Sequence, residues 1–321
     1  MVANLPLLDV ILAVYEPDLV ALGRQIEGVL AQTGCRPRLT LFVDGPMPQL
    51  PAIVALASRH PAVAMVGFPE NRGPAATFLE GLAHVLAAPE ENGEERYFAF
   101  CDQDDLWHAD KFQVSLVRLR ASGAAAVHSD ARVVDASVCV VAPSLFDMEG
   151  RQRDPRLAAL FFRNNATGMT LVMEEPLARQ VAQLRHLRPE RWLHDHFVAF
   201  VAAAGAGLVL EPRALVDYVQ HGGNMVGAGG ASMGLPILPS FGFLDPHGAA
   251  ARWIEQGADL VAVLLAMEDL PQARRAELAA LHRLLVGRGI ADLPRAAAAL
   301  WRIPRISRAL VAQLLWARLA R

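Results

Sequence analysis

The sequence predicts an α/β protein in which a mostly parallel sheet carries flanking helices and a helical C-terminal extension follows. Runs of apolar residues without polar alternation are typical of strands that are buried on both faces. Between residues 7 and 130 such runs alternate with segments of helical periodicity, which is the pattern of a parallel sheet. Acidic or polar turns follow several of the runs, and ligands of such sheets bind beyond the carboxyl ends of the strands.

The strands and helices of the first 130 residues are predicted from local signals. Residues 7–14 are apolar except for one aspartate, and residues 39–43 form a second apolar run that ends at Asp44. Pro74 is favoured in the first turn of a helix, and Gly123 is favoured just after the end of one. We expect strands at residues 7–14, 39–43, 63–67, 97–101 and 124–129 and helices at 19–31, 53–58, 75–87 and 111–121.

The second half of the chain carries weaker signals. Residues 166–173 are expected to form a strand, and Pro189 is expected to open a helix over residues 192–204. Short strands are expected at residues 208–210 and 215–218. The remaining ranges are a link rich in glycine and proline at 228–248 and a region of helical composition at 249–321.

The composition excludes several classes of protein. The 321 residues are 53% apolar and 20% charged, with a net charge of −3, which excludes a disordered chain, a collagen and a disulfide-rich module. The slightly acidic balance argues against a nucleic-acid partner. The three cysteines form no CxxC pair and no metal signature, so we expect reduced thiols in a cytoplasmic protein.

We expect the protein to contact the inner face of the plasma membrane through its C-terminal tail. The N-terminus lacks the basic region and cleavage site of a signal peptide, and the longest apolar run has 14 residues, fewer than the about 18–20 of a spanning helix. Residues 295–321 carry six arginines, no acid and apolar residues at helical spacing, which is typical of a helix on an anionic membrane. Packing of this helix on the protein's own core is the alternative.

The strongest chemical signal is the acidic segment that follows the fourth predicted strand. Asp102, Asp104 and Asp105 place three carboxylates within four residues, and their repulsion costs stability unless a cation or hydrogen bonds compensate it. Mg²⁺ typically binds one or two carboxylates together with the phosphates of a substrate. The segment therefore predicts a site for a metal ion and a diphosphate, and a solvated turn with a helix-capping aspartate is the alternative.

Five segments together resemble a known family of enzymes. VILAVYEP, FVDG, ENRGPAATFLEGL, YFAFCDQDDLWHADK and VHSDARVVD occur in the order expected of inverting, metal-dependent, nucleotide-sugar glycosyltransferases of family 2. Among these the sequence is most similar to rhamnosyltransferase-type members that build bacterial surface polysaccharides, and the resemblance covers residues 7–227. It implies a GT-A domain at 1–227, with a nucleotide-binding half at 1–135 and an acceptor half at 136–227, before the link and the helical C-terminal region.

The resemblance assigns the donor site to residues at the predicted strand ends. The metal that it implies is Mg²⁺ or Mn²⁺, which would neutralise the leaving diphosphate as a Lewis acid. The assigned residues are Tyr15 and Glu16 in the nucleotide pocket, Asp44 beside the base, Asp102 near the ribose, Asp104 on the metal, Asp105 in support of either role, and Arg72 as added positive charge.

A second signal, at residues 192–196, supplies the expected general base. Inversion at the anomeric carbon needs a group that takes the proton from the acceptor hydroxyl as it attacks. The resemblance places this base at Asp195. His194 or His196 is the alternative base, and packing or orientation is the alternative role for both histidines.

A third signal, at residues 218–224, resembles the segment that closes the donor site in the family. It makes His221 a candidate ligand of the metal or the diphosphate, with a loop histidine as the alternative, and Val219 stands where the family has an arginine. Thr167 and Gly168 resemble the strand that lines the acceptor cleft, where a glycine lets a sugar approach the backbone.

The resemblance implies transfer of a sugar from dTDP-rhamnose or a UDP-hexose to a growing surface glycan or a lipid-linked saccharide. The Asp102-Gln103-Asp104 segment also resembles the nucleophile pair of haloacid-dehalogenase-type phosphotransferases. That class carries the pair on its first strand and needs a later lysine with an acidic pair, whereas the only lysine here is Lys111. A catalytically inactive GT-A subunit that only binds its ligand is a third hypothesis.

Overall fold

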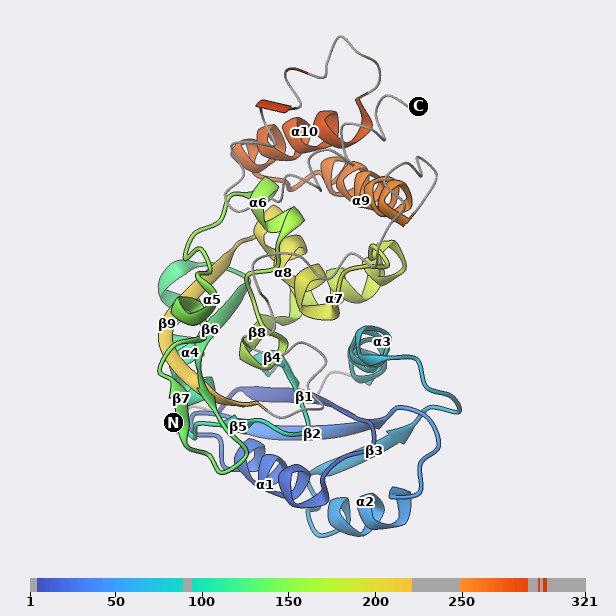
Figure 1. Ribbon diagram of the computed structural model, residues 1–321, viewed down its shortest axis with the longest axis vertical. Coiled ribbons are helices and arrows are strands. Elements are labelled where there is room, and N and C mark those ends of the chain that lie inside the picture. The colour runs from blue at the N-terminus through green and yellow to red at the C-terminus, as the bar shows by residue number, and fades with distance from the viewer. Residues whose placement is uncertain (1–4, 89–93, 221–248, 288–293, 295–296, 299–321) are drawn as a thin grey trace.

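A central sheet carries helices on both of its faces (Figure 1). The computed structural model describes residues 5–88, 94–220, 249–287, 294, 297 and 298. In these residues the strand order is β3-β2-β1-β4-β8-β6-β9-β5, and β7 pairs with β6 outside this path. The predicted α/β class with flanking helices is therefore confirmed.

Four strands form the parallel part of the sheet. β1 (Leu7–Val14) lies between β2 (Arg36–Val43) and β4 (Arg96–Cys101), and β3 (Val63–Gly67) pairs with β2. Because all of these pairings are parallel, the carboxyl ends of the strands lie at one edge of the sheet. β1 and β3 have the predicted bounds, whereas β2 and β4 begin earlier than predicted.

The rest of the sheet is mixed, which corrects the expectation of a mostly parallel sheet. β8 (Leu171–Glu174) is antiparallel to β4 on one side and to β6 (Ala126–Val134) on the other. β9 (Leu208–Val219) runs parallel to β6. Two short strands, β5 (Leu106–Trp107) and β7 (Val140–Ala142), pair antiparallel with β9 and β6. The two short strands expected near the end of this half are therefore one continuous strand, β9.

Residues 145–187 hold more helix than the sequence predicts. The strand expected at 166–173 is a 3₁₀ turn, η1 (Gly168–Thr170), followed by β8. Helices of five or six residues complete less than two turns, so they leave no clear helical period in the sequence. The helix expected at 192–204 is α8 (His194–Ala204), and the elements that were not predicted are α5 (Leu145–Glu149), α6 (Leu157–Phe162), α7 (Glu175–Leu184) and η2 (Arg185–Leu187).

The helices cover two faces because side chains alternate along each strand. In β1, Leu8 and Val10 belong to one buried apolar cluster, whereas Ile11 belongs to the other. The helices on the face of Leu8 are α1 (Leu19–Leu30), α2 (Leu50–Ala57) and α4 (Lys111–Ser122), and those on the face of Ile11 are α3 (Pro74–Leu86), α7 and α8.

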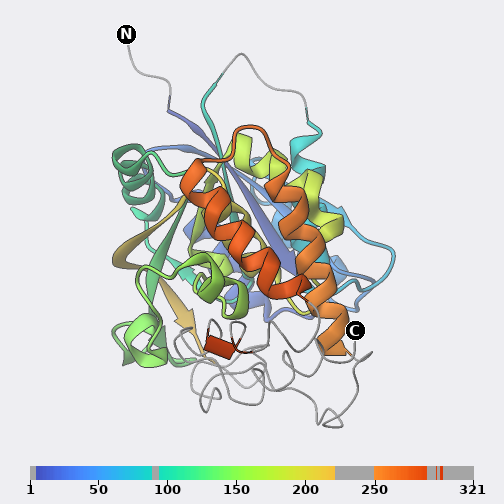
Figure 2. The same ribbon diagram turned by 90° about the horizontal axis from the view of Figure 1, so that it is seen from above.

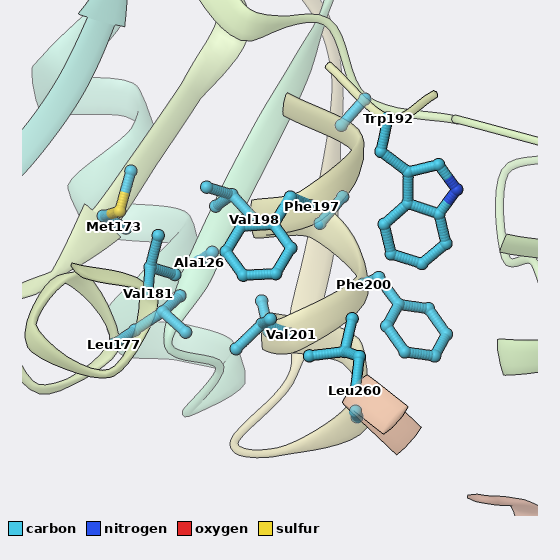
Figure 3. Close-up of a cluster of buried hydrophobic side chains, with 14 of the residues drawn as sticks. Ala126, Met173, Leu177, Val181, Trp192, Phe197, Val198, Phe200, Val201 and Leu260 are labelled. Carbon is cyan, nitrogen blue, oxygen red and sulfur yellow. The ribbon is translucent and has the colours of Figure 1, made fainter. Parts of the chain in front are cut away.

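Two further helices lie side by side at the end of the molecule away from α1 and α2 (Figures 1 and 2). α9 (Ala249–Leu265) packs on η2 and α10 (Gln272–Val286) on α6. Trp253 of α9 stacks on Phe161 of α6, with ring centroids 5.7 Å apart. Leu260 extends the buried cluster around α8, as Figure 3 shows.

Some predicted features lie outside the described residues. These are the link at 228–248, His221, and the tail at 295–321 except for residues 297 and 298. Within the part of the chain that the structure describes, none of the helices has the length and apolar character that a membrane span requires.

A glycine in α9 tests the docking of the C-terminal helices. A Cβ on Gly257 would lie 2.3 Å from Cζ of Phe161, and the Phe161 ring cannot move away because it packs against four other aromatic rings. Gly257→Ala should therefore lower the free energy of unfolding by about 1–3 kcal/mol, as overpacking does. Urea denaturation of the variant and the wild type measures this difference.

Gly23→Ala in α1 is the matched control. A Cβ on Gly23 would lie 3.5 Å from its nearest neighbour, a side-chain carbon of Leu56, which is an ordinary contact. Because alanine favours a helix by up to about 1 kcal/mol over glycine, this variant should be at least as stable as the wild type. Equal losses of stability in both variants would contradict the packing described for α9.

Candidate active site

Three polar turns meet where the parallel strands end. Tyr15 follows β1, Asp44 follows β2 and Asp102 follows β4. The side chain of Gln103 joins two of these turns, since its Oε1 accepts from the backbone N–H of Tyr15 at 2.9 Å and its Nε2 donates to the Tyr15 carbonyl at 3.0 Å. The turn after β1 is thereby fixed to the acidic segment.

The turn after β1 has an unusual backbone. Glu16 has a φ of +43°, in the left-handed region that a glutamate rarely adopts. The side chain of Tyr15 is 46% exposed, and Glu16 is exposed as well. Both predicted pocket residues therefore lie at the surface of the carboxyl edge, where a nucleotide can reach them.

Asp44 is buried and holds a second loop against the strand ends. Its Oδ1 accepts from the backbone N–H of Arg72 at 2.8 Å, and its Oδ2 accepts from that of Gly73 at 3.0 Å. Gly45 permits this close approach, because its φ is +88° and a Cβ there would lie 2.7 Å from the neighbouring backbone. The guanidinium of Arg72 lies over the ring of Phe68, 4.5 Å from the centroid. The structure thus brings Asp44 and Arg72 together through the loop backbone.

The acidic segment after β4 concentrates negative charge. Burial, together with repulsion from Asp104 and Asp195, raises the pKa of Asp102 to about 7. Burial and the charges of Asp102 and Asp104 raise the pKa of Asp105 well above its usual range. The carboxylates therefore interact with one another, as the sequence predicts, and binding of a cation would relieve their repulsion.

Asp105 connects the acidic segment to the end of β9. The residue is 1% exposed, and its Oδ1 accepts from the backbone N–H of Val219 at 3.1 Å. Its Oδ2 has no hydrogen-bond partner among the described atoms. Trp107 in β5 is also paired with Val216 in β9. The end of β9, two residues before His221, therefore lies beside the acidic segment.

Asp195 joins the acidic segment from a distant part of the sequence. It stands in the first turn of α8, is 7% exposed, and adds to the raised pKa of Asp102. Its carboxylate accepts hydrogen bonds from the backbone N–H of His196 at 2.6 Å, from the backbone N–H of Gly168, and from the side chain of Asn164. Burial nevertheless raises the pKa of Asp195 to about 6. A carboxylate with that pKa is mostly ionised at neutral pH and can accept a proton.

Arg151 also influences the predicted base, although no sequence motif marks it. Its positive charge lowers the pKa of Asp195. Its Nη1 donates to Oγ1 of Thr167 at 2.7 Å, and its Nε donates to Glu149 at 2.7 Å. Thr167 is therefore connected to the surroundings of Asp195 through Arg151. Only the folded chain brings this arginine, which lies between two short unpredicted helices, to the start of α8.

The two histidines beside the predicted base are packed against aromatic rings. His194 stacks on Phe78 with centroids 3.9 Å apart, and His196 stacks on Trp192 at 4.2 Å. A ring nitrogen of His196 lies 2.6 Å from the carbonyl oxygen of Leu160. Burial lowers the pKa of His194 to about 3 and that of His196 to about 4. These surroundings favour the packing role over the role of a base for both residues.

Lys111, at the start of α4, is buried in the core. Its Nζ lies 3.8 Å from the ring centroid of Trp107 and has no hydrogen-bond partner among the described atoms. Burial lowers the pKa of Lys111 to about 7. The only lysine of the sequence is therefore held against an aromatic ring.

A known family model matches the part of the chain that carries Asp44 and the acidic segment. Residues 9–157 match the family model described as Glycosyl transferase family 2. Those residues are similar to a glycosyltransferase family 2 domain. The domain includes Asp44 and the acidic segment and ends before Asp195. None of the curated proteins matches the sequence.

Several solved structures are similar to this chain. S. aureus TarS 1–349 in complex with UDP-GlcNAc is 13% identical, with a TM-score of 0.54 over 91% of this chain and 79% of that chain. S. aureus TarS is 12% identical, with a TM-score of 0.53 over 97% of this chain and 52% of that chain. The mannosyltransferase PcManGT from Pyrobaculum calidifontis, in complex with GDP-Man and Mn²⁺, is 16% identical, with a TM-score of 0.49 over 98% and 86%. The likeness to TarS and the family 2 domain show the GT-A fold.

The loop that Asp44 holds can be tested by one substitution. Asp44→Asn replaces one of the two accepting oxygens with an NH₂ group. Because an NH₂ group only donates hydrogen bonds, one of the two backbone N–H groups loses its acceptor. The free energy of unfolding should fall by about 1–3 kcal/mol, the cost of a buried unpaired donor. Thermal and urea unfolding of the ligand-free protein measure this loss.

Asp18→Asn is the matched control for this prediction. Oδ1 of Asp18 accepts from the backbone N–H groups of Val20 and Ala21 at the start of α1, and an asparagine oxygen can do the same. We expect this variant to keep its stability. If Asp44→Asn were as stable as Asp18→Asn, the described role of Asp44 would be wrong.

Proposed function

We propose that this chain is an inverting glycosyltransferase that moves a sugar from a nucleotide-sugar donor to a hydroxyl of a growing bacterial surface glycan. The proposal depends mainly on one observation, namely that Asp195 lies close enough to the acidic segment for its charge to raise the pKa of Asp102, which is within the residues that match family 2. The UDP-GlcNAc bound to TarS supports a nucleotide-sugar donor. The donors that we favour are dTDP-rhamnose and a UDP-hexose, as in a rhamnosyltransferase-type enzyme.

Asp195 is the general base in this proposal. Its carboxylate takes the proton from the acceptor hydroxyl, which then attacks the anomeric carbon from the face opposite the leaving diphosphate. Backbone N–H groups of Gly168 and His196 orient the carboxylate, and Thr167 with Arg151 lies on the acceptor side. The neutral, packed rings beside it exclude water from the base.

The donor nucleotide is proposed to bind at the carboxyl ends of the parallel strands. Tyr15 and Glu16 offer exposed surface for the nucleotide there, and Asp44 shapes the loop that carries Arg72. Asp102 would accept hydrogen bonds from the ribose at the end of β4. His221 remains a proposed ligand of the diphosphate or the metal.

The acidic segment fits a hard divalent cation. Asp104 would hold it, and Asp105 has a buried Oδ2 without a partner among the described atoms, beside two further carboxylates. The described residues hold no group of three or more His, Cys, Asp and Glu side chains placed to bind a metal ion by themselves. Mg²⁺ usually binds one or two carboxylates together with the substrate phosphates, so in this proposal the phosphate oxygens of the donor would complete the ligands of Mg²⁺ or Mn²⁺. A bound cation supplies positive charge to the leaving diphosphate.

The acceptor is proposed to be a glycan or a lipid-linked saccharide, with residues 295–321 on an anionic membrane surface at the cytoplasmic face. A phosphotransferase of the haloacid-dehalogenase type is less favoured, because the only lysine of the sequence packs on Trp107 in the core. An inactive binding subunit is distinguished from an enzyme by the experiments below.

Asp195→Asn tests the proposed base. The amide keeps the shape of the side chain but cannot take a proton, so transfer should fall by about 10²–10⁴-fold while the affinity for the donor nucleotide stays the same. Transfer is measured with radiolabelled donor, and donor affinity by calorimetry. Glu190→Gln, at an exposed carboxylate before α8, is the control and should keep full activity. Normal turnover by Asp195→Asn would remove this residue from the role.

The pH dependence of kcat provides a second test of the base. The raised pKa of Asp195, about 6, means that its carboxylate is ionised above pH 6 and becomes protonated below it. Because only the ionised form accepts a proton, kcat should fall by about tenfold per pH unit below pH 6. A kcat that stayed constant down to pH 4.5 would contradict the assignment.

A further inference from the structure

The 3₁₀ turn η1 and the start of α8 meet at Gly168. A Cβ on Gly168 would lie 2.5 Å from Nε2 of His194, which is shorter than any real contact of this kind. The imidazole therefore fills the space directly over the glycine. The approach of a sugar to the backbone at Gly168 stays a prediction, and the ring of His194 occupies the side of the glycine where a side chain would stand.

The ring of His194 is also fixed by two other elements. It stacks on Phe78 of α3 with centroids 3.9 Å apart and meets Phe100 of β4 edge-on at 5.0 Å. Neither ring nitrogen has a hydrogen-bond partner among the described atoms, and burial lowers the pKa of His194 to about 3. The side chain is therefore a neutral, flat ring that is held between α3, β4 and η1.

The same glycine contacts the proposed base. Its backbone N–H donates a hydrogen bond to the carboxylate of Asp195, the residue that follows His194. The charged groups that face Asp195 from other elements are Arg151, which attracts it, and Asp102, which repels it. Gly168 thus contacts two consecutive residues of α8. Its backbone N–H binds Asp195, and the ring of His194 fills the place that a side chain at position 168 would occupy.

We propose that Gly168 is a positioning residue for Asp195, which it holds through its backbone N–H while its lack of a side chain leaves room for the ring of His194. Any side chain at position 168 pushes this ring, and with it the first turn of α8, away from η1. The hydrogen bond from position 168 to the carboxylate then breaks. The inference rests on the proposed function only in that Asp195 acts as the base.

The test compares four full-length proteins, namely the wild type, Gly168→Ala, His194→Ala and the double variant. The pKa of Asp195 is measured without substrate by carbon-13 NMR of the aspartate carboxyl groups, and Asp195→Asn identifies the signal. In Gly168→Ala the pKa should rise by about one unit or more, because a hydrogen bond to the charged form is lost. kcat should fall by about 10- to 100-fold, with KM for the donor changed by less than about twofold.

The double variant tests whether the ring is the cause. Once the ring of His194 is removed, a methyl group at position 168 has room, so the pKa of Asp195 and kcat should return to the values of His194→Ala. A Gly168→Ala protein with wild-type pKa and kcat would overturn the proposal. A double variant that resembled Gly168→Ala rather than His194→Ala would overturn it as well.

The experiment also separates a folding failure of Gly168→Ala from a failure of the proposed function. If Gly168→Ala alone does not fold, the double variant and His194→Ala still give the comparison, and a pKa of Asp195 that differed between them by one unit would overturn the proposal. A wild-type protein that transferred no sugar would count against the proposed function alone, because the NMR titration needs no substrate.

Discussion

The crowding of carboxylates at the carboxyl edge of the sheet is the constraint on which the rest of the site depends. Asp102, Asp104 and Asp105 follow β4, and Asp195 approaches them from α8. Burial raises the pKa of three of these groups, and repulsion adds to it for Asp102 and Asp105, so the site favours bound protons or a bound cation over bare negative charge. In the proposed reaction a leaving diphosphate would bring further negative charge to this site, so a cation beside Asp104 would stabilise both the folded protein and the transition state.

The two sides of the site are held by different interactions. On the proposed donor side, the side chains of Asp44 and Gln103 bind backbone groups of neighbouring turns, so hydrogen bonds fix loops that contact solvent. On the side of the proposed base, aromatic rings pack around His194 and His196, and burial keeps both histidines neutral. Asp195 stands between these packed rings and the acidic segment, and burial raises the pKa of its carboxyl group to about 6.

Those parts of the fold with strong local signals could be predicted from the sequence. β1 and β3 have the predicted bounds because unbroken apolar runs mark strands that are buried on both faces. The direction of β8 could not be predicted, since four residues carry no mark of the strand that they pair with. Within the site, the acidic segment was evident from its charge, and the structure brings the predicted Asp195 to it. Arg151 and Asn164 reach the same carboxylate only through the fold, and the role of Gly168 depends on a side chain from another element.

We propose that the acidic segment binds a nucleotide together with a divalent cation. The most direct measurement is the melting temperature of the wild type with UDP, dTDP and their sugars, each with Mn²⁺, with Mg²⁺ or with a chelator, because a ligand of the native state raises the melting temperature. We expect a rise with at least one nucleotide that requires the metal and is absent in Asp104→Ala. No rise with any nucleotide in the presence of metal, or the same rise in Asp104→Ala, would contradict the claim.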